Sequence, residues 1–98
     1  MDNNLYVIVH EKSVRRSVPY RPMASKVLQE IERIKSTERF ISHEEEPTWI
    51  NENMPGPSAG LKVRMVGAYA GLCVAIHKEL LENLGYCVEM HGPGCLDA

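Results

Sequence analysis

The residues best suited to chemistry are a cysteine and several histidines beside predicted strand ends. Cys73 follows the apolar segment 61–67 and falls in the first turn of a predicted helix. Backbone N–H groups in a first helical turn have no intrahelical partner, and the helix dipole favours negative charge there. A thiol so placed can become a thiolate nucleophile, and the same N–H groups can hold an oxyanion. The alternative is a small buried apolar side chain, as many cysteines are.

Three histidines are the last residues of predicted strands: His10, His43 and His91. Parallel strands bring their carboxyl ends to one edge of the sheet, so we expect these side chains near one another. An alternative role for the three histidines is to bind zinc together with a carboxylate, through nitrogen and oxygen ligands. No two of them have a local ligand spacing, however, and we predict no metal and no other cofactor.

A base for Cys73 and a ligand pocket can be assigned at the same edge. His10 or Glu11 would take the thiol proton, by analogy with Cys–His pairs. Trp49, in a polar loop, is expected to line the pocket with His43 and His91. His77 falls inside a predicted helix, where we expect it at the surface or in packing.

The apolar patterns predict the elements that position these residues. A continuous apolar run is typical of a buried parallel strand, and an i, i+4 stripe is typical of an amphipathic helix. We predict strands over residues 4–10, 39–43, 62–67 and 86–91, and helices over 22–36 and 72–84. The stripe of the second helix would be Leu72, Ile76, Leu80, Leu81 and Leu84. We predict loops over 11–22, 44–60 and 91–98.

This order of elements predicts an α/β fold. Strand–helix–strand units favour a parallel sheet. We predict one small three-layer Rossmann-like α/β domain over residues 1–98, with a mostly parallel four-stranded sheet in the order 2-1-3-4. Ligands bind such sheets at the switch point, which here lies between the first and third strands.

Composition restricts the partners. The chain has 98 residues, a formal net charge of -2 and 44% hydrophobic residues, which does not suggest nucleic acid or an acidic membrane as partner. No apolar run approaches the roughly 20 residues that span a bilayer. The odd number of cysteines predicts free thiols and a cytoplasmic location. We expect a small-molecule ligand. The oligomeric state stays open, and a homo-oligomer is an alternative, because a four-stranded sheet with short edges could need a partner chain to complete its core.

The last third of the chain contains an ordered series of motifs. These are "VRMVG", "AYAGL", Cys73 with Val74, "AIHKELLENL", Gly85-Tyr86, "CVEM" and "HGPGC". In this order and spacing the segment resembles the isochorismatase-like cysteine hydrolases, which include nicotinamidases. The resemblance implies that Cys73 is the nucleophile and that the backbone amides of Tyr69 and Cys73 form an oxyanion site. It also implies a cis peptide bond between Ala68 and Tyr69.

Other positions depart from that family. The aspartate that follows its first strand corresponds to Val9, which cannot take a proton. Its catalytic lysine has no counterpart, since Lys62 does not match its position, and the acidic residue two before the cysteine is Gly71. The sequence therefore favours a reduced relative that binds a small ligand or a protein partner at the carboxyl edge. The alternatives are a cysteine-dependent hydrolase of a small amide or related C–N bond, and a generic small α/β domain.

Overall fold

The computed structural model describes residues 3–98, so the first two residues of the predicted domain lie outside it. Its elements are β1 (Asn3–Val9), α1 (Glu11–Ser17), α2 (Pro22–Thr37), β2 (Phe40–His43), β3 (Leu61–Ala68), α3 (Cys73–Asn83) and β4 (Cys87–Leu96). The four strands pair in parallel in the order β2-β1-β3-β4. The predicted α/β class and strand order are confirmed.

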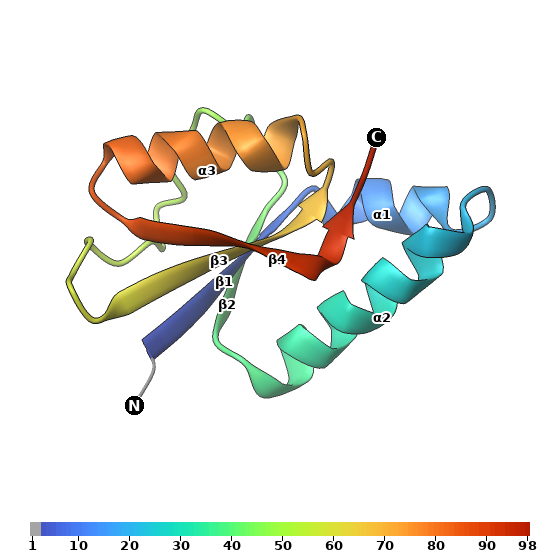
Figure 1. The fold of residues 1–98 in the computed structure, drawn as a ribbon, viewed down its shortest axis with the longest axis horizontal. Coiled ribbons are helices and arrows are strands. Elements are labelled where there is room, and N and C mark those ends of the chain that lie inside the picture. Colours follow the sequence, from blue (N-terminus) through green and yellow to red (C-terminus); the bar gives the residue numbers. More distant parts are fainter. Residues whose placement is uncertain (1–2) are drawn as a thin grey trace.

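Helices cover both faces of the sheet, with α3 on one side and α2 on the other (Figure 1). The two faces carry separate apolar clusters. Along β1, Leu5, Val7 and Val9 belong to the α3-side cluster, whereas Tyr6 and Ile8 belong to the α2-side cluster. Successive side chains of a strand point to opposite faces. A strand buried on both faces must therefore be apolar throughout, which explains the unbroken run in the sequence.

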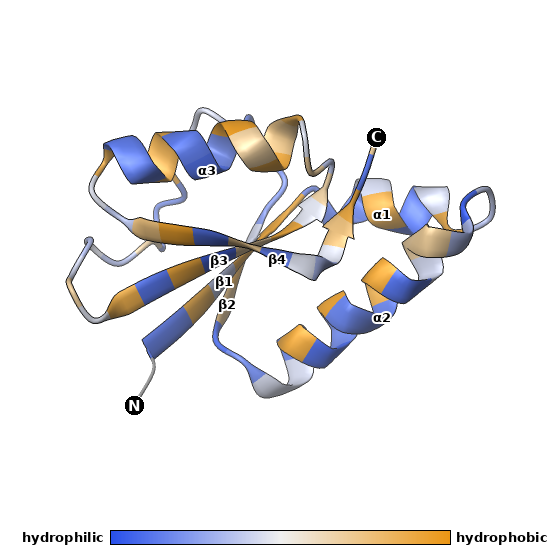
Figure 2. Cartoon of the chain, in the orientation of Figure 1, coloured by the Kyte–Doolittle hydropathy of each residue, from blue (hydrophilic) through white to orange (hydrophobic). Residues whose placement is uncertain are grey.

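The helix α2 begins at Pro22, whose fixed backbone suits the first helical position. Its buried residues, Ala24, Val27, Ile31 and Ile34, recur at helical spacing, and Figure 2 shows apolar and hydrophilic segments alternating along it. It is the longest helix, with 16 residues. Among residues 3–98 no helix combines the length and the apolarity that crossing a bilayer would require.

The helix α3 packs through only part of the predicted stripe, because Leu81 is buried whereas most of the stripe is not. Its buried residues are Val74, His77 and Leu81, whereas Leu72 and Leu84 are about half exposed. The spacings of three and four residues between the buried positions place them on one side of a helix. The middle residue of the buried side is His77, which a pattern of apolar residues does not include. The apolar pattern therefore predicted a stripe that contains Leu81 but not Val74 or His77.

The segment 11–22, predicted as a loop, contains the helix α1. Val14 is fully buried in the α2-side cluster and anchors this seven-residue helix. Glu11 lies in its first turn and Arg15 in its last, which complements the helix dipole. The two prolines of this segment lie after α1 and at the start of α2, so neither interrupts a helix.

The last strand is also longer than predicted. β4 continues through the segment predicted as a terminal loop and ends at Leu96, which is buried. Its pairing with β3 shifts register between Met65 and Gly67. A β-carbon on Gly94 would lie 2.5 Å from a Val66 methyl carbon, so glycine permits the close approach. The other predicted ends of β1–β4, α2 and α3 agree with the structure to within one residue.

Candidate functional site

A cavity of about 520 Å³ opens at the carboxyl edge of the sheet. It is lined by His10, Glu44, Glu45, Glu46, Pro47, Trp49 and Cys73. Three predicted site residues, Cys73, His10 and Trp49, therefore meet at one cavity, although they come from three parts of the chain. His43 lines an adjoining cavity of about 280 Å³, which shares Trp49 and Glu45 with the first.

The switch point between β1 and β3 depends on one glycine. Gly67 has a φ of +117°, and a β-carbon there would lie 1.9 Å from the Val9 carbonyl oxygen. Only glycine allows this approach without moving the backbone of β1. Directly after Val9, His10 adopts a left-handed conformation, and its N–H donates to the His43 carbonyl at 2.9 Å. The backbone that carries His10 is thereby fixed against both neighbouring strands.

The predicted nucleophile occupies the first position of α3. Cys73 is partly buried, and the preceding Ala68–Tyr69 peptide bond is cis, as the resemblance implied. Within residues 3–98, the backbone N–H groups of Tyr69 and Cys73 have no hydrogen-bond acceptor. The Cys73 N–H is thus available beside the cavity that its side chain lines.

The side chain of Tyr69 lies away from the cavity. Its ring packs against the α2-side cluster and does not line the cavity. The Arg21 guanidinium carbon lies 6.0 Å from the centre of that ring. The Tyr69 carbonyl accepts hydrogen bonds from the N–H groups of Leu72 and Val74, which ties the strand–helix junction together.

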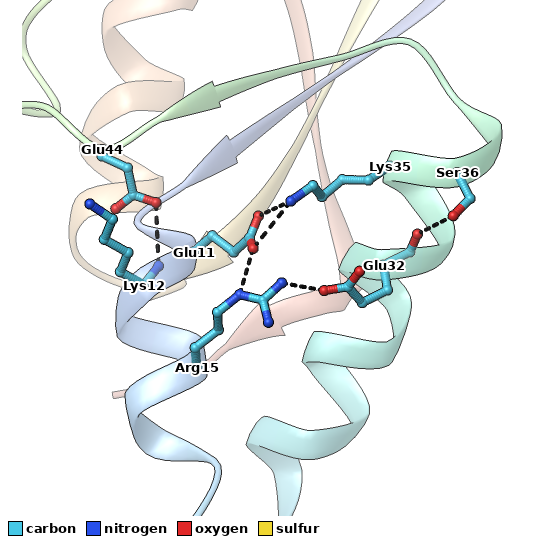
Figure 3. A network of polar contacts seen from close by, with 7 residues as sticks. All are labelled: Glu11, Lys12, Arg15, Glu32, Lys35, Ser36 and Glu44. Carbon is cyan, nitrogen blue, oxygen red and sulfur yellow. Dashed lines mark hydrogen bonds and ion pairs between the residues drawn. The ribbon is translucent and has the colours of Figure 1, made fainter.

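Glu11, one of two predicted bases, is engaged elsewhere (Figure 3). Its carboxylate accepts hydrogen bonds from Arg15 at 2.8 Å and from Lys35 at 3.1 Å, and Arg15 also pairs with Glu32. Burial acts to raise the pKa of Glu11, but these hydrogen bonds and the two positive charges outweigh it and lower the pKa. Glu11 does not line the cavity. It joins α1 to α2, and the structure leaves His10 as the candidate base.

His91 is not at the predicted pocket. Because β4 continues to Leu96, His91 lies within the strand and not at its carboxyl end. Its Nε2 lies 2.5 Å from a Glu30 carboxylate oxygen of α2, and its ring meets the Tyr6 ring edge-on at 5.4 Å. These contacts place His91 on the α2 side of the sheet.

Three histidines hold the cavity wall through consecutive backbone carbonyls. His10 Nε2 bonds the Glu45 carbonyl at 2.9 Å, and His43 Nε2 bonds the next carbonyl, that of Glu46, at 2.8 Å. His77 Nδ1 bonds the following carbonyl, that of Pro47, at 2.6 Å. A carbonyl oxygen only accepts, so each of these nitrogens carries the hydrogen. His10 Nδ1 therefore keeps a lone pair that can take a proton.

His77 is the residue that the sequence pattern missed. It is fully buried and belongs to the packed face of α3, not to the surface. The available signal was its spacing from Val74 and Leu81, which places it on the buried side of the helix. A buried histidine must find hydrogen-bond partners, and here the loop supplies one.

The cavity combines an aromatic side chain with acidic ones. Trp49 is 59% exposed, and its N–H closes a turn on the Glu46 carbonyl at 3.0 Å. Glu44 accepts a hydrogen bond from the Lys12 N–H at 3.3 Å, so its carboxylate faces α1 (Figure 3). Three glutamates line the cavity without a lysine or arginine. Such a lining favours neutral or positively charged ligands over anions.

Among residues 3–98, no group of three or more histidine, cysteine, aspartate or glutamate side chains is arranged to hold a metal ion. Comparison of the chain with protein-family models, with curated proteins and with solved structures finds no match.

Proposed function

We propose that the chain is a reduced relative of the isochorismatase-like cysteine hydrolases that binds a small molecule at the carboxyl edge of its sheet. The observation that supports this most is the cavity lined by Cys73, His10 and Trp49. The Trp49 ring offers an apolar surface, and the Cys73 N–H offers a donor to a carbonyl oxygen. The glutamates disfavour an anionic ligand. The ligand class is therefore a flat, neutral or cationic molecule that carries a hydrogen-bond acceptor.

Binding is favoured over catalysis because most of the catalytic group is missing. Val9 stands where the related hydrolases have their aspartate base. Glu11 is held by two cations and lies outside the cavity. What the cavity retains is a shape and a set of polar contacts, which suffice for recognition.

Three probes of nearly identical shape test this proposal by calorimetry on the full chain: benzamide, benzamidine and benzoate. We expect benzamide and benzamidine to bind, and benzoate to bind at least tenfold more weakly, because three carboxylates line the cavity. Trp49→Ala should weaken binding of benzamide at least tenfold, which corresponds to about 1.4 kcal/mol.

Tyr20→Ala is the matched control, because Tyr20 is an exposed aromatic residue (84%) outside the cavity. It should leave all three affinities unchanged. Absence of binding by every probe at millimolar concentration would contradict the proposal, and so would a Trp49→Ala variant that binds as tightly as the wild type.

A second candidate function is hydrolysis of a small amide, favoured by the meeting of Cys73 and His10 at one cavity. In this reaction the Cys73 sulfur attacks the amide carbon while its proton passes to His10 Nδ1. The N–H groups of Tyr69 and Cys73 hold the oxyanion. The C–N bond then breaks, and His10 returns the proton to the departing amine. Water hydrolyses the resulting thioester to a carboxylic acid and the free thiol.

A further inference from the structure

The cavity wall formed by residues 44–49, here called the lid segment, is held by side chains from three different elements. His10 follows β1, His43 ends β2 and His77 lies in α3. Each donates one ring N–H to the carbonyl of residue 45, 46 or 47, at 2.9, 2.8 and 2.6 Å. The lid segment contains no strand or helix of its own. These three hydrogen bonds therefore provide its principal polar attachment to the sheet and to α3.

Two of the three rings form a buried pair. The rings of His43 and His77 are stacked, with centroids 4.3 Å apart and planes inclined by 25°. His43 is 1% exposed and His77 is 0% exposed. The second ring nitrogen of each, Nδ1 of His43 and Nε2 of His77, is buried and has no hydrogen-bond partner among residues 3–98. The two neutral rings are thus fixed as donors to the lid segment, each with an unused lone pair.

A proton is poorly accommodated at this pair. A second N–H on either ring would be a buried donor without an acceptor, which is unfavourable, and more so for a charged group. Charge on one stacked ring also opposes charge on the other. Burial accordingly lowers the pKa of His77. The hydrogen bond to the Pro47 carbonyl raises it, and any positive charge on His43 or His10 would lower it further. Among residues 3–98 the geometry therefore offers no acceptor for a second N–H on either ring.

We propose that His43 and His77 form a pH-sensitive latch, which holds the lid segment closed when both rings are neutral and releases it when either takes up a proton. Released rings regain water, which can satisfy both nitrogens. Other titratable groups near the pair are His10 from the β1–α1 junction, Cys73 from α3 and the glutamates of the lid segment. The consequence of the latch for ligand binding rests on the function proposed above, whereas the movement of the lid segment does not.

The sign of the pH dependence follows from proton uptake. In the closed state burial lowers the pKa of His77, and in the open state a solvated histidine protonates at its ordinary pKa of about 6.5. Opening therefore takes up protons below about pH 6.5. The ratio of open to closed molecules should rise about tenfold per pH unit for each proton taken up.

The latch is tested without any ligand, so its failure and that of the binding proposal are distinguishable. Amide hydrogen exchange over residues 45–49 is measured on the full chain from pH 7.5 to 5.0 and corrected for intrinsic rates. Trp49 emission provides a second readout, since it is the one tryptophan of the sequence. We expect opening of the lid segment to increase at least tenfold below pH 6.5 while far-ultraviolet circular dichroism is unchanged.

Matched variants distinguish the pH response of His43 and His77 from that of other titratable groups. His77→Asn keeps a donor near the position of Nδ1, and His43→Gln keeps one near that of Nε2, but neither amide titrates. The double variant should lose the pH dependence above pH 5. His91→Gln is the control, because His91 lies on the other side of the sheet, and it should retain the wild-type response.

Two results would overturn the latch. One is a wild-type lid segment whose exchange does not change between pH 7.5 and 5.0. The other is a double variant that keeps the wild-type response, which would assign it to His10 or the lid glutamates. Should the variants not fold, ring resonances of His43 and His77 in the wild type decide. The latch predicts that the chemical shifts of these ring resonances and the amide exchange of residues 45–49 change over the same pH interval. Changes over different pH intervals would refute the latch.

Discussion

At the scale of single residues, the hydrolysis candidate requires Cys73 to be more reactive than Cys87 and Cys95. Cys73 begins α3 and lines the cavity, Cys87 is exposed on β4, and Cys95 is partly buried. Burial raises the pKa of Cys95 to about 11, helped by the nearby Asp97 charge. The reactivity of Cys73 can therefore be compared within one chain with that of an exposed thiol, Cys87, and of a thiol with a raised pKa, Cys95.

Alkylation with iodoacetamide at pH 7.5, followed by peptide mass spectrometry, tests whether Cys73 is a nucleophile. The hydrolase candidate predicts that Cys73 reacts at least tenfold faster than the exposed Cys87, because helix amides and His10 would favour the thiolate. Cys95 should hardly react, since at its raised pKa fewer than about one in a thousand molecules carry a thiolate.

His10→Ala should slow alkylation of Cys73 and leave that of Cys87 unchanged, because a Cys–His pair would be lost. A Cys73 rate equal to or below that of Cys87 argues against hydrolysis and leaves only ligand binding.

At the scale of elements, the sequence predicted where the strands and two helices lie but not all of their contacts. The strands were predictable because central parallel strands need unbroken apolar runs, as β1 has. The face of α3 was not, because it packs through a histidine whose partner, the Pro47 carbonyl, is 30 residues away in sequence. The length of β4 was missed because glycine and proline in its second half resemble a loop, whereas pairing with β3 is a tertiary effect.

Two leucines of the predicted stripe, one buried within α3 and one exposed at its C-terminal end, test how this helix packs. Leu81 is fully buried and Leu84 is 48% exposed. Leu81→Ala should lower the free energy of unfolding by about 2–5 kcal/mol, because it leaves a cavity in the core. Leu84→Ala should change it by less than about 0.5 kcal/mol. Urea unfolding of both variants measures this, and equal losses would show that the packed face is assigned wrongly.

At the scale of the whole molecule, the sheet and the helix layer beside it are joined by polar contacts as well as by the core. Glu30 of α2 accepts hydrogen bonds from Arg33 at 2.6 Å and from His91 of β4 at 2.5 Å. The hydrogen bond from Arg33 lowers the pKa of Glu30 most; burial opposes this, and His91 adds to it, so that the pKa falls to about 2. A carboxylate whose pKa is depressed in the folded state stabilises that state above its unfolded pKa.

We therefore expect protonation of Glu30 to lower the free energy of unfolding at acidic pH. The contribution of Glu30 is complete above about pH 4.5 and is lost as the pH falls towards about 2, because the unfolded chain binds the proton more readily. Glu30→Gln should reduce the slope of the unfolding free energy over that interval, measured by urea unfolding at several pH values. Glu79→Gln, on the exposed side of α3, is the control and should keep the wild-type slope. An unchanged slope in Glu30→Gln would contradict the assignment.

The attachment of the lid segment has an evolutionary consequence. The three imidazoles bind main-chain carbonyls, which every amino acid possesses, and not the side chains of residues 45–47. The side chains of Glu45 and Glu46 can therefore be exchanged while the wall keeps its place. A descendant or a designed variant could replace these acids with bases, and so admit anions, without rebuilding the scaffold. The charge of the cavity lining and the position of its wall therefore depend on different atoms of these residues.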